Sequence, residues 1–396
     1  MKKITVIHII TRFDKGGSAE NTFLTVSRLD KNKYRVILIK GSSLESNMDE
    51  KEMVSANLNL ETLKKNDVAI INLPSLVRRI DPANDIKALF NLFGILRREK
   101  PDIVHTHTSK AGLLGRWSAF LVRVPFIVHT PHGHVFHSYF GFIKTKVFII
   151  AEKISSLITD TIITLTNRER DEHIKERIAP KKKFVTIPSG VELERFTKID
   201  IDVEAKKREL HIADDSFIIG TIGRLVPIKG HTYLISAVKK IVEEFPKTTL
   251  LFIGDGHLKS ELEEQAKRLG VRDSVVFAGW RNDIPEILKL FDILVFPSLN
   301  EGMGKVVIEG MAQGKPIIAS NVGGIRDLIK DGVNGILVPP KDAEAIETSL
   351  LQLMKNRALA EELGKKGKTI VYPDFDASTM VKKIENLYES LLARAH

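Results

Sequence analysis

Short apolar runs rich in β-branched residues alternate with amphipathic stretches along almost the whole chain. In the first half, Ile4 to Ile10 and Tyr34 to Lys40 have the length and composition of buried strands, and Asp85 to Glu99 has the apolar spacing of a helix. The pattern begins again at Phe217 to Ile222, and helical spacing follows at Thr232 to Glu244. Strands that alternate with helices form parallel sheets with right-handed crossovers. The sequence therefore predicts an α/β protein with two doubly wound parallel sheets.

Length and composition are consistent with this fold. The chain has 396 residues, of which 43% are hydrophobic, so it can form two ordinary domains that each bury a core. No stretch approaches the roughly 18 to 20 apolar residues of a membrane span. We interpret the first residues, MKKITVIHIITRF, as the first strand of a cytoplasmic protein, because they alternate as a strand does and lack a signal-peptide cleavage site. The absence of cysteine excludes disulfides and thiolate metal sites.

Positive charge is concentrated in the first half of the chain. Up to Gly190, 31 Lys and Arg stand against 19 Asp and Glu, whereas the remainder has 29 against 31. Residues 110–146 combine cations with aromatic side chains and contain no acidic residue. Further cations are supplied by Arg78, Arg79, Arg97 and Arg98. Such a surface suits a membrane that bears acidic lipids or single-stranded nucleic acid, unless it is simply a solvated basic face.

Residues 295–324 carry the most specific motif, two glutamates in the arrangement E-x7-E. A buried strand ends at Pro297, and a glycine loop then leads into a helix. A helix N-terminus behind such a loop offers free N–H groups and partial positive charge to an anion. Glu301 lies in the loop, and we place Glu309 about two turns into the helix. The loop residues between the two glutamates are Gly302, Met303 and Gly304.

Two other glycine-containing loops follow predicted strands. Arg224 and Lys229 stand beside Gly223, where two fixed cations could make charge-assisted contacts to a diphosphate. Gly16 and Gly17 follow the first strand, where glycine lets the backbone approach a phosphate. Either loop alone is also compatible with an ordinary surface turn.

Six of the twelve histidines lie between residues 105 and 137. Their H-x-H and H-x2-H-x-H spacings could supply imidazoles to a metal. Asp102 is the only carboxylate nearby and cysteine is absent, so we expect no metal site. His105 and His107, at the end of a strand, could either contact a bound substrate or pack inside the protein.

Three motifs resemble those of family 4 glycosyltransferases, retaining enzymes of the two-domain GT-B fold. They are SLNEGMGKVVIEGMAQGKPIIASNVGG, GRLVPIKGH and VHTPHGH. The resemblance implies an acceptor-side domain at residues 1–188, a nucleotide-sugar-binding domain at 189–376, and a C-terminal helix at 377–396 that crosses back to the first domain. The substrates of such an enzyme bind in the cleft between the domains.

The resemblance also implies a role for each site residue. Glu301 would hold the sugar hydroxyls and Glu309 the nucleotide ribose, while Arg224 and Lys229 neutralise the leaving diphosphate. His132 would contact the transferred sugar and stabilise the charge that develops in its ring. The remaining donor-binding residues would be Gly16, Gly17, Gly223, Arg281, Gly302, Met303 and Gly304. On the acceptor side, the candidates are His105, His107, Lys110 and His134, and His134 is also the alternative to His132.

The predicted activity is retaining transfer of a sugar from a nucleotide-diphosphate sugar to an acceptor hydroxyl, without a metal or other cofactor. The predicted acceptor is a polyprenyl-linked glycan of polysaccharide or lipopolysaccharide synthesis, met at the anionic inner face of the cell membrane. A soluble acceptor and a nucleotide-sugar epimerase on the same fold remain alternatives. A solute-binding protein would need a secretion signal, and nucleic-acid binding does not explain the E-x7-E motif. Because the backbone reads the base in this family, UDP, GDP and ADP donors are not distinguished.

Overall fold

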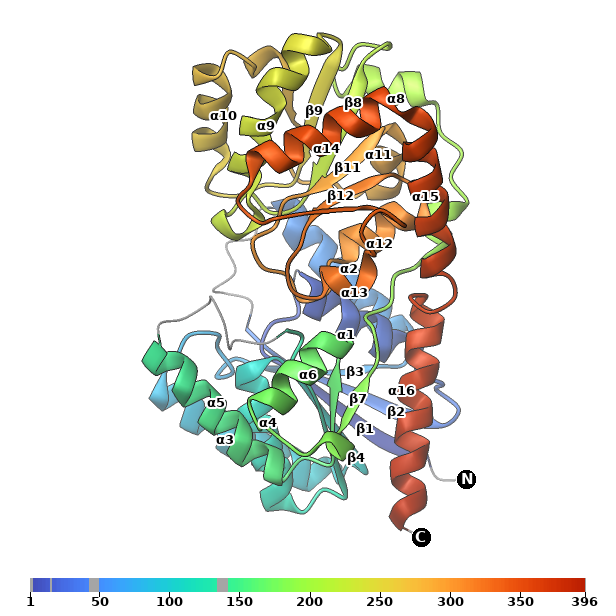
Figure 1. Ribbon diagram of the computed structural model, residues 1–396. Helices are drawn as coiled ribbons and strands as arrows, with labels where there is room; N and C mark the ends of the chain where they lie inside the picture. The colour runs from blue at the N-terminus through green and yellow to red at the C-terminus, as the bar shows by residue number, and fades with distance from the viewer. Residues whose placement is uncertain (1–2, 15, 43–49, 134–141, 396) are drawn as a thin grey trace. The chain divides into compact units, whose positions relative to one another are not determined.

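The computed structural model describes residues 3–14, 16–42, 50–133 and 142–395, which form two compact units (Figure 1). Unit 1 comprises Met1–Gly190 and Ala377–His396, and unit 2 comprises Val191–Asp376. The chain therefore leaves unit 1 two residues after the predicted boundary and returns to it at residue 377. Within the described residues, no helix is both long and apolar enough to cross a bilayer.

Unit 1 is a parallel sheet with helices on both faces. The strands are β1 (Ile4–Ile10), β2 (Tyr34–Gly41), β3 (Ala69–Leu73), β4 (Ile103–His107), β5 (Phe126–Thr130), β6 (Thr161–Thr164) and β7 (Phe184–Thr186). The helices are α1 (Gly17–Arg28), α2 (Glu50–Lys65), α3 (Pro82–Glu99), α4 (Ser109–Val122), α5 (Phe142–Leu157), α6 (Asn167–Lys175) and α16 (Ala377–Leu392), with short 3₁₀ turns η1 (Lys181–Lys183) and η4 (Ala393–Ala395).

Unit 2 repeats this design. Its strands are β8 (Phe217–Ile222), β9 (Thr248–Ile253), β10 (Val275–Phe277), β11 (Ile293–Phe296), β12 (Ile317–Ser320) and β13 (Ile336–Val338). Its helices are α7 (Glu194–Thr197), α8 (Val203–Glu209), α9 (His231–Glu244), α10 (Lys259–Arg268), α11 (Ile284–Leu290), α12 (Lys305–Ala312), α13 (Ile325–Leu328), α14 (Ala343–Lys355) and α15 (Arg357–Val371), with 3₁₀ turns η2 (Pro227–Lys229) and η3 (Arg272–Ser274).

The strand order of each sheet reverses once. In the described residues the orders are β3-β2-β1-β4-β5-β6-β7 and β10-β9-β8-β11-β12-β13, with parallel pairing throughout. Such doubly wound sheets were predicted from the alternation of strands and helices. Ligands of these sheets bind beyond the carboxyl ends of the strands at the reversal. We therefore expect ligands to bind at the loops after β1 and β4 in unit 1, and after β8 and β11 in unit 2.

The alternation of side chains along β1 supplies both faces of the unit 1 sheet. Val6 and Ile10 pack in a cluster that includes Tyr388 of α16, whereas Ile7 and Ile9 pack in a cluster that includes Leu92 of α3. A strand that is buried on both faces must be apolar almost throughout, which is why its sequence was recognisable.

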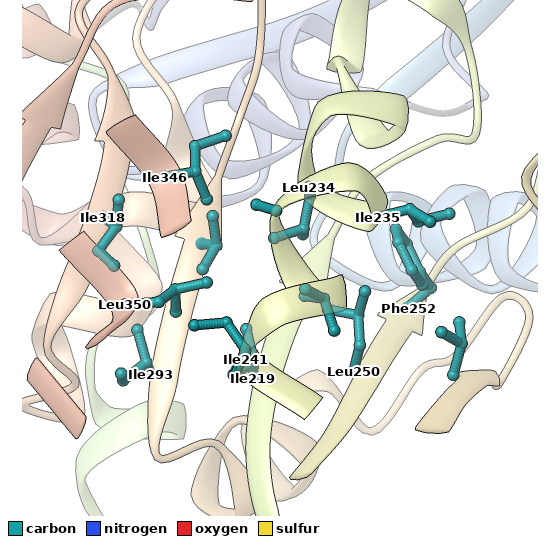
Figure 2. Packing of buried hydrophobic residues seen from close by; sticks show 14 of the residues in the cluster. Ile219, Leu234, Ile235, Ile241, Leu250, Phe252, Ile293, Ile318, Ile346 and Leu350 are labelled. Carbon is teal, nitrogen blue, oxygen red and sulfur yellow. The ribbon is translucent and has the colours of Figure 1, made fainter. Parts of the chain in front are cut away.

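Figure 2 shows the main core of unit 2. Ile219 of β8, Leu250 of β9 and Ile293 of β11 meet Leu234 of α9 and Leu350 of α14. All five side chains are almost completely buried. This core fixes the carboxyl ends of β8 and β11, from which the predicted donor-site loops emerge.

One segment was left unassigned, and one prediction needs correction. Residues 41–75 are weakly patterned, and the sequence indicated only a possible strand at Val68 to Leu73, which is β3; it did not predict α2, on which the apolar residues Val54 and Leu58 are exposed. Glu309 was placed about two turns into its helix, but α12 begins at Lys305 and Glu309 is only slightly more than one turn from its start.

Candidate functional site

Unit 2 brings two predicted catalytic residues into direct contact. Lys229, at the end of η2, donates from Nζ to Glu301 Oε2 over 2.6 Å. Its methylene groups pass over Gly223, where a Cβ would lie 3.6 Å from Lys229 Cδ. Both charged side chains keep about a fifth of their surface exposed, at 19% and 22%. A cation and a carboxylate therefore stand together at the reversal of the sheet, accessible to a ligand.

Two glycines shape the backbone around Glu301, one in its own loop and one in the loop after β12. Gly304 precedes α12 with φ of 73°, and a Cβ there would lie 2.3 Å from Ile325 Cδ1. Gly323 has φ of 44°, and its Cβ would lie 1.9 Å from the carbonyl oxygen of Glu301. That same oxygen accepts the N–H of Gly324 over 3.2 Å. These contacts fix the backbone of Glu301 against the loop after β12.

The other predicted donor-site residues of unit 2 differ in how far they are buried. Met303 is buried, whereas Gly302 and Glu309 are half-buried. Arg224 is exposed, and its guanidinium forms no ion pair within the described part of the chain. α12 begins after Gly304 without a side-chain cap.

The side chain of Arg281, a predicted donor-binding residue, is held by carboxylates of its own unit. Its Nε and Nη2 donate to Asp283 over 2.7 and 2.5 Å, and Nη2 also donates to Glu209 of α8 over 2.5 Å. The fork of hydrogen bonds from Arg281 holds the pKa of Asp283 well below its ordinary range. The guanidinium thus ties the turn after β10 to α8, and its charge is neutralised by protein carboxylates.

In unit 1, Gly16 and Gly17 form the junction between β1 and α1. Gly16 has φ of 98° and caps α1, and Gly17 is the first helical residue. The glycine loop therefore lies at the strand reversal, as the predicted phosphate contact requires.

The pairing of β1 with β4 gathers three histidines on one face of the unit 1 sheet. His105 and His107 share that face because they are two residues apart, and His8 is the register partner of His105. His8 Nδ1 lies 2.9 Å from His107 Nε2, and His107 Nδ1 lies 2.9 Å from Nε2 of His132. His105 and His107 are fully buried, so the internal-packing alternative describes both.

His8, His105 and His107 are also the group in the described chain that could hold a metal ion, since one ring nitrogen of each lies within 4.8 Å of the others. These nitrogens already have partners. His105 Nδ1 lies 2.6 Å from the hydroxyl of Tyr388, and His105 Nε2 lies 2.8 Å from Oγ1 of Thr130. A metal would have to replace hydrogen bonds that satisfy the rings as they stand.

The loop after β5 holds His132 in an unusual backbone conformation. His132 has φ of 60°, which is uncommon for a residue with a side chain and is typical of functional sites. The next N–H, of Gly133, donates to Glu169 Oε1 over 3.0 Å, and Leu165 N–H donates to Oε2 over 2.6 Å. Burial raises the pKa of Glu169 to about 7. His134 lies outside the described residues.

Burial keeps the histidines of this site neutral. It lowers the pKa of His8 and of His132 to about 3, and it lowers those of His105, His107 and His129 well below the ordinary value. Each ring therefore carries a single proton at neutral pH.

We expect unit 1 to lose stability on acidification. Below pH 6.5 these histidines take up protons in the unfolded chain but not in the folded one, so the unfolding free energy falls by about 1.4 kcal/mol per pH unit for each net proton. Glu169, whose pKa is raised to about 7, binds a proton in the folded chain before the unfolded one does. Its effect on the unfolding free energy is therefore opposite in sign and cancels that of one histidine. Urea unfolding followed at about pH 7.5 and about pH 5.5 measures the slope. A stability independent of pH over this interval would show that the histidines titrate normally.

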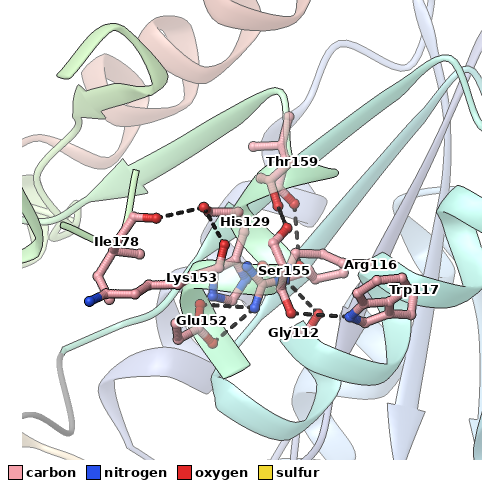
Figure 3. A network of polar contacts seen from close by, with 12 residues as sticks. Gly112, Arg116, Trp117, His129, Glu152, Lys153, Ser155, Thr159 and Ile178 are labelled. Atoms are coloured by element: carbon pink, nitrogen blue, oxygen red, sulfur yellow. Dashed lines mark hydrogen bonds and ion pairs between the residues drawn. The ribbon is translucent and has the colours of Figure 1, made fainter. Parts of the chain in front are cut away.

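Lys110 and Arg116 are less available than the sequence suggested. Lys110 Nζ donates to Asp85 over 2.6 Å and also to the carbonyl oxygen of Arg79. Arg116 was expected among the surface cations, and this was wrong: it is fully buried and donates to both carboxylate oxygens of Glu152 over 2.9 Å (Figure 3). The pair joins α4 to α5, with Trp117 Nε1 donating to Ser155 Oγ alongside.

Sequence reasoning missed three residues of the unit 1 site. His8 stands within an apolar strand, and a polar residue at such a position is a usable signal. Tyr388 of α16 is 283 residues from its partner His105, and Glu169 of α6 is 36 residues from its partner Gly133. No local sequence pattern identifies either residue as part of the site.

Comparisons with known proteins find glycosyltransferases for both units of the chain. The family profile described as "Glycosyltransferase Family 4" matches residues 15–195, and the one described as "Glycosyl transferases group 1" matches residues 202–370. An Escherichia coli UDP-Gal:alpha-D-GlcNAc-diphosphoundecaprenol alpha-1,3-galactosyltransferase is 34% identical over 80% of this chain and 82% of its own. The Staphylococcus aureus capsular polysaccharide biosynthesis glycosyltransferase CapM is 29% identical over 83% of this chain and 87% of its own. The crystal structure of Anabaena HepE with UDP and glucose superposes with a TM-score of 0.82 at 19% identity, covering 98% of this chain and all of that one (100%).

Proposed function

Because this chain belongs to the family 4 glycosyltransferases and has their GT-B fold, we propose that it transfers a sugar, with retention of configuration, from a nucleotide-diphosphate sugar to a lipid-linked glycan in polysaccharide synthesis. The observation that carries the proposal is the contact between Lys229 and Glu301 at the strand reversal of unit 2. The ammonium of Lys229 suits a leaving diphosphate and the carboxylate of Glu301 suits sugar hydroxyls. The pair therefore supports a donor site in which the phosphate and the sugar lie next to each other.

Departure of the nucleotide needs positive charge. Lys229 turns from Glu301 to a phosphate oxygen when the donor binds, and Arg224 and backbone N–H groups of the loop from Gly302 to Gly304 add positive charge. Stabilising the leaving diphosphate lets the bond to the anomeric carbon break early.

Retention follows if the acceptor attacks from the face that the phosphate leaves. Glu301 binds sugar hydroxyls, Glu309 binds the ribose, and neither acts as a nucleophile. The acceptor hydroxyl forms the new bond and gives its proton to the departing phosphate. His132 contacts the sugar and stabilises the positive charge of its ring. This scheme differs from that of retaining glycoside hydrolases, in which a carboxylate attacks the anomeric carbon.

The name of the E. coli relative supports a lipid-linked acceptor, because it specifies a sugar on diphosphoundecaprenol. Nucleotide sugar and acceptor are both substrates, and we propose that no metal takes part. An assay with a polyprenyl-diphosphate-linked N-acetylglucosamine, in the presence of a chelator, tests these points together. The expected product is a lipid-linked disaccharide whose anomeric configuration, read by NMR, equals that of the donor. An inverted product would exclude the mechanism, and loss of transfer with the chelator would exclude metal independence.

Unit 1 presents an apolar face that fits an anionic membrane surface. On α5 the exposed residues Val147, Ile150, Ile154 and Leu157 recur at helical spacing, and their exposed fractions range from 48% to 77%. α4 packs against both α3 and α5 and adds Phe120 and Leu121, while α3 adds Ile86 and Phe90. Exposed cations nearby in sequence include Lys146, Arg78 and Arg79. Apolar residues that enter the interface and cations that meet acidic lipids together bind such a surface.

We expect Ile150→Glu to weaken binding to vesicles containing acidic phospholipid by more than about tenfold, since it removes an apolar contact and adds a repelled charge. Ile370→Glu, at an exposed position of α15 in unit 2, is the matched control and leaves binding unchanged. Sedimentation with vesicles measures both. Equal binding to neutral and acidic vesicles, or full binding by Ile150→Glu, would show that this face does not meet the membrane.

A further inference from the structure

His132 stands at one end of an unbroken run of hydrogen bonds that reaches the C-terminal helix. In order, the run contains His132, His107, His8, Tyr388, His105 and Thr130. The two bonds between imidazoles are both 2.9 Å, and the hydroxyl of Tyr388 lies 3.4 Å from His8 Nε2 and 2.6 Å from His105 Nδ1. At the free end, His132 Nδ1 is buried and has no partner among the described residues.

A run of neutral imidazoles has only two possible proton arrangements. Each ring offers one N–H and one lone pair, so the two bonds that join His132, His107 and His8 must point the same way. If the bonds point toward His132, its free Nδ1 carries a proton and donates. If they point toward Thr130, the free Nδ1 is a lone pair and accepts. The donor or acceptor character of His132 is thus decided by groups that do not touch it.

The short contact of Tyr388 selects between the two arrangements. The hydroxyl of Tyr388 has one proton and two imidazole nitrogens beside it, and it donates to the nearer one, His105 Nδ1 at 2.6 Å, rather than to His8 Nε2 at 3.4 Å. The oxygen of Tyr388 then has only lone pairs to offer His8, and His8 Nε2 must carry the proton that faces it. It follows that His107 donates to His8 and that His132 Nε2–H donates to His107.

We propose that Tyr388, His8 and His107 are positioning residues that hold His132 as its Nε2–H tautomer, so that Nδ1 accepts a hydrogen bond from a hydroxyl of the transferred sugar. This inference rests on the proposed glycosyl transfer. A buried nitrogen without a partner is costly, and a sugar hydroxyl that donates to it recovers that cost only in the complex. An electron-rich nitrogen beside the ring also suits the positive charge of the transition state.

The wild-type protein tests the direction of the run without any substitution. Heteronuclear NMR of the imidazole nitrogens separates N–H from bare nitrogen, and the signals of His132 are assigned by their loss in His132→Gln. We expect a proton on Nε2 and a bare Nδ1. A proton on Nδ1 of His132 would overturn the proposal.

Tyr388→Phe tests the coupling. The hydroxyl is lost while the ring remains in the core, so His132 should become a mixture of tautomers and the turnover number should fall about tenfold, with little change in the KM of the donor. Tyr34→Phe is the matched control. Tyr34 is also fully buried, and its ring packs edge-on against Tyr388 with 6.1 Å between the ring centroids. Its hydroxyl has no partner among the described residues. It should leave tautomer and turnover unchanged.

Three results would contradict the coupling. These are an unchanged His132 tautomer in Tyr388→Phe, an unchanged turnover, and equal losses in the Tyr34→Phe and Tyr388→Phe variants, which would indicate a structural effect alone. Failure of the proposed function is distinguishable, because a wild-type protein without transfer activity would still report the tautomer of His132.

Discussion

Replacing Lys229 with alanine is expected to lower glycosyl transfer by about a hundredfold to a thousandfold, the range found when one preorganised donor to a developing charge is removed. Two reasons predict a large effect. Under the proposed function the variant lacks the cation that meets the leaving diphosphate, and it leaves Glu301 without the partner 2.6 Å away. An unpaired carboxylate beside the diphosphate repels it. The fold should survive, because the ion pair is partly exposed and contributes no more than about 1 kcal/mol to stability.

Initial rates with subsaturating donor measure this loss. Lys247→Ala is the control, since Lys247 is an exposed lysine of the same unit that pairs with Asp215. The double variant Lys229→Ala with Glu301→Gln distinguishes the two causes, because it removes the repulsion but not the need for a cation. Unchanged kinetics in Lys229→Ala would remove the residue from the donor site.

His132→Ala should lower turnover by about a hundredfold while changing donor affinity much less. The reason is that the charge it stabilises develops chiefly in the transition state. Its ring is held by His107, and its loop by the contact of Gly133 with Glu169, so the imidazole is preorganised. Turnover and the dissociation constant of the donor are measured separately, with His257→Ala, an exposed histidine of unit 2, as the control. Equal turnover with weaker donor binding would make His132 a ground-state contact only.

The parts of the fold that were predicted correctly are those whose cause is local. β1, β8 and β11 are buried on both faces, so their sequences are mostly apolar runs of strand length. α2 was missed because several of its apolar residues are exposed, and its periodicity is weak. Whether such a segment is helical depends on contacts with the rest of the unit, which the local pattern does not contain.

The same distinction applies to the site. The loop from Glu301 to Glu309 is contiguous in sequence, so its residues could be named in advance. A sequence does not show whether a cation has already found a carboxylate. Arg281 pairs with Glu209, 72 residues away, and Arg116 pairs with Glu152, 36 residues away. Tyr388 reaches His105 only because α16 returns to unit 1.

The most direct test of the central claim is to follow the sugar itself. The purified protein is incubated with nucleotide sugars labelled in the sugar and with a polyprenyl-diphosphate-linked acceptor, and the label in the organic phase is counted. Transfer by the wild-type protein from at least one donor, lost in Lys229→Ala, is the expected result. Label recovered only as an epimerised nucleotide sugar, as a glycoside of a soluble acceptor, or in the unchanged donor would contradict transfer to a lipid-linked glycan.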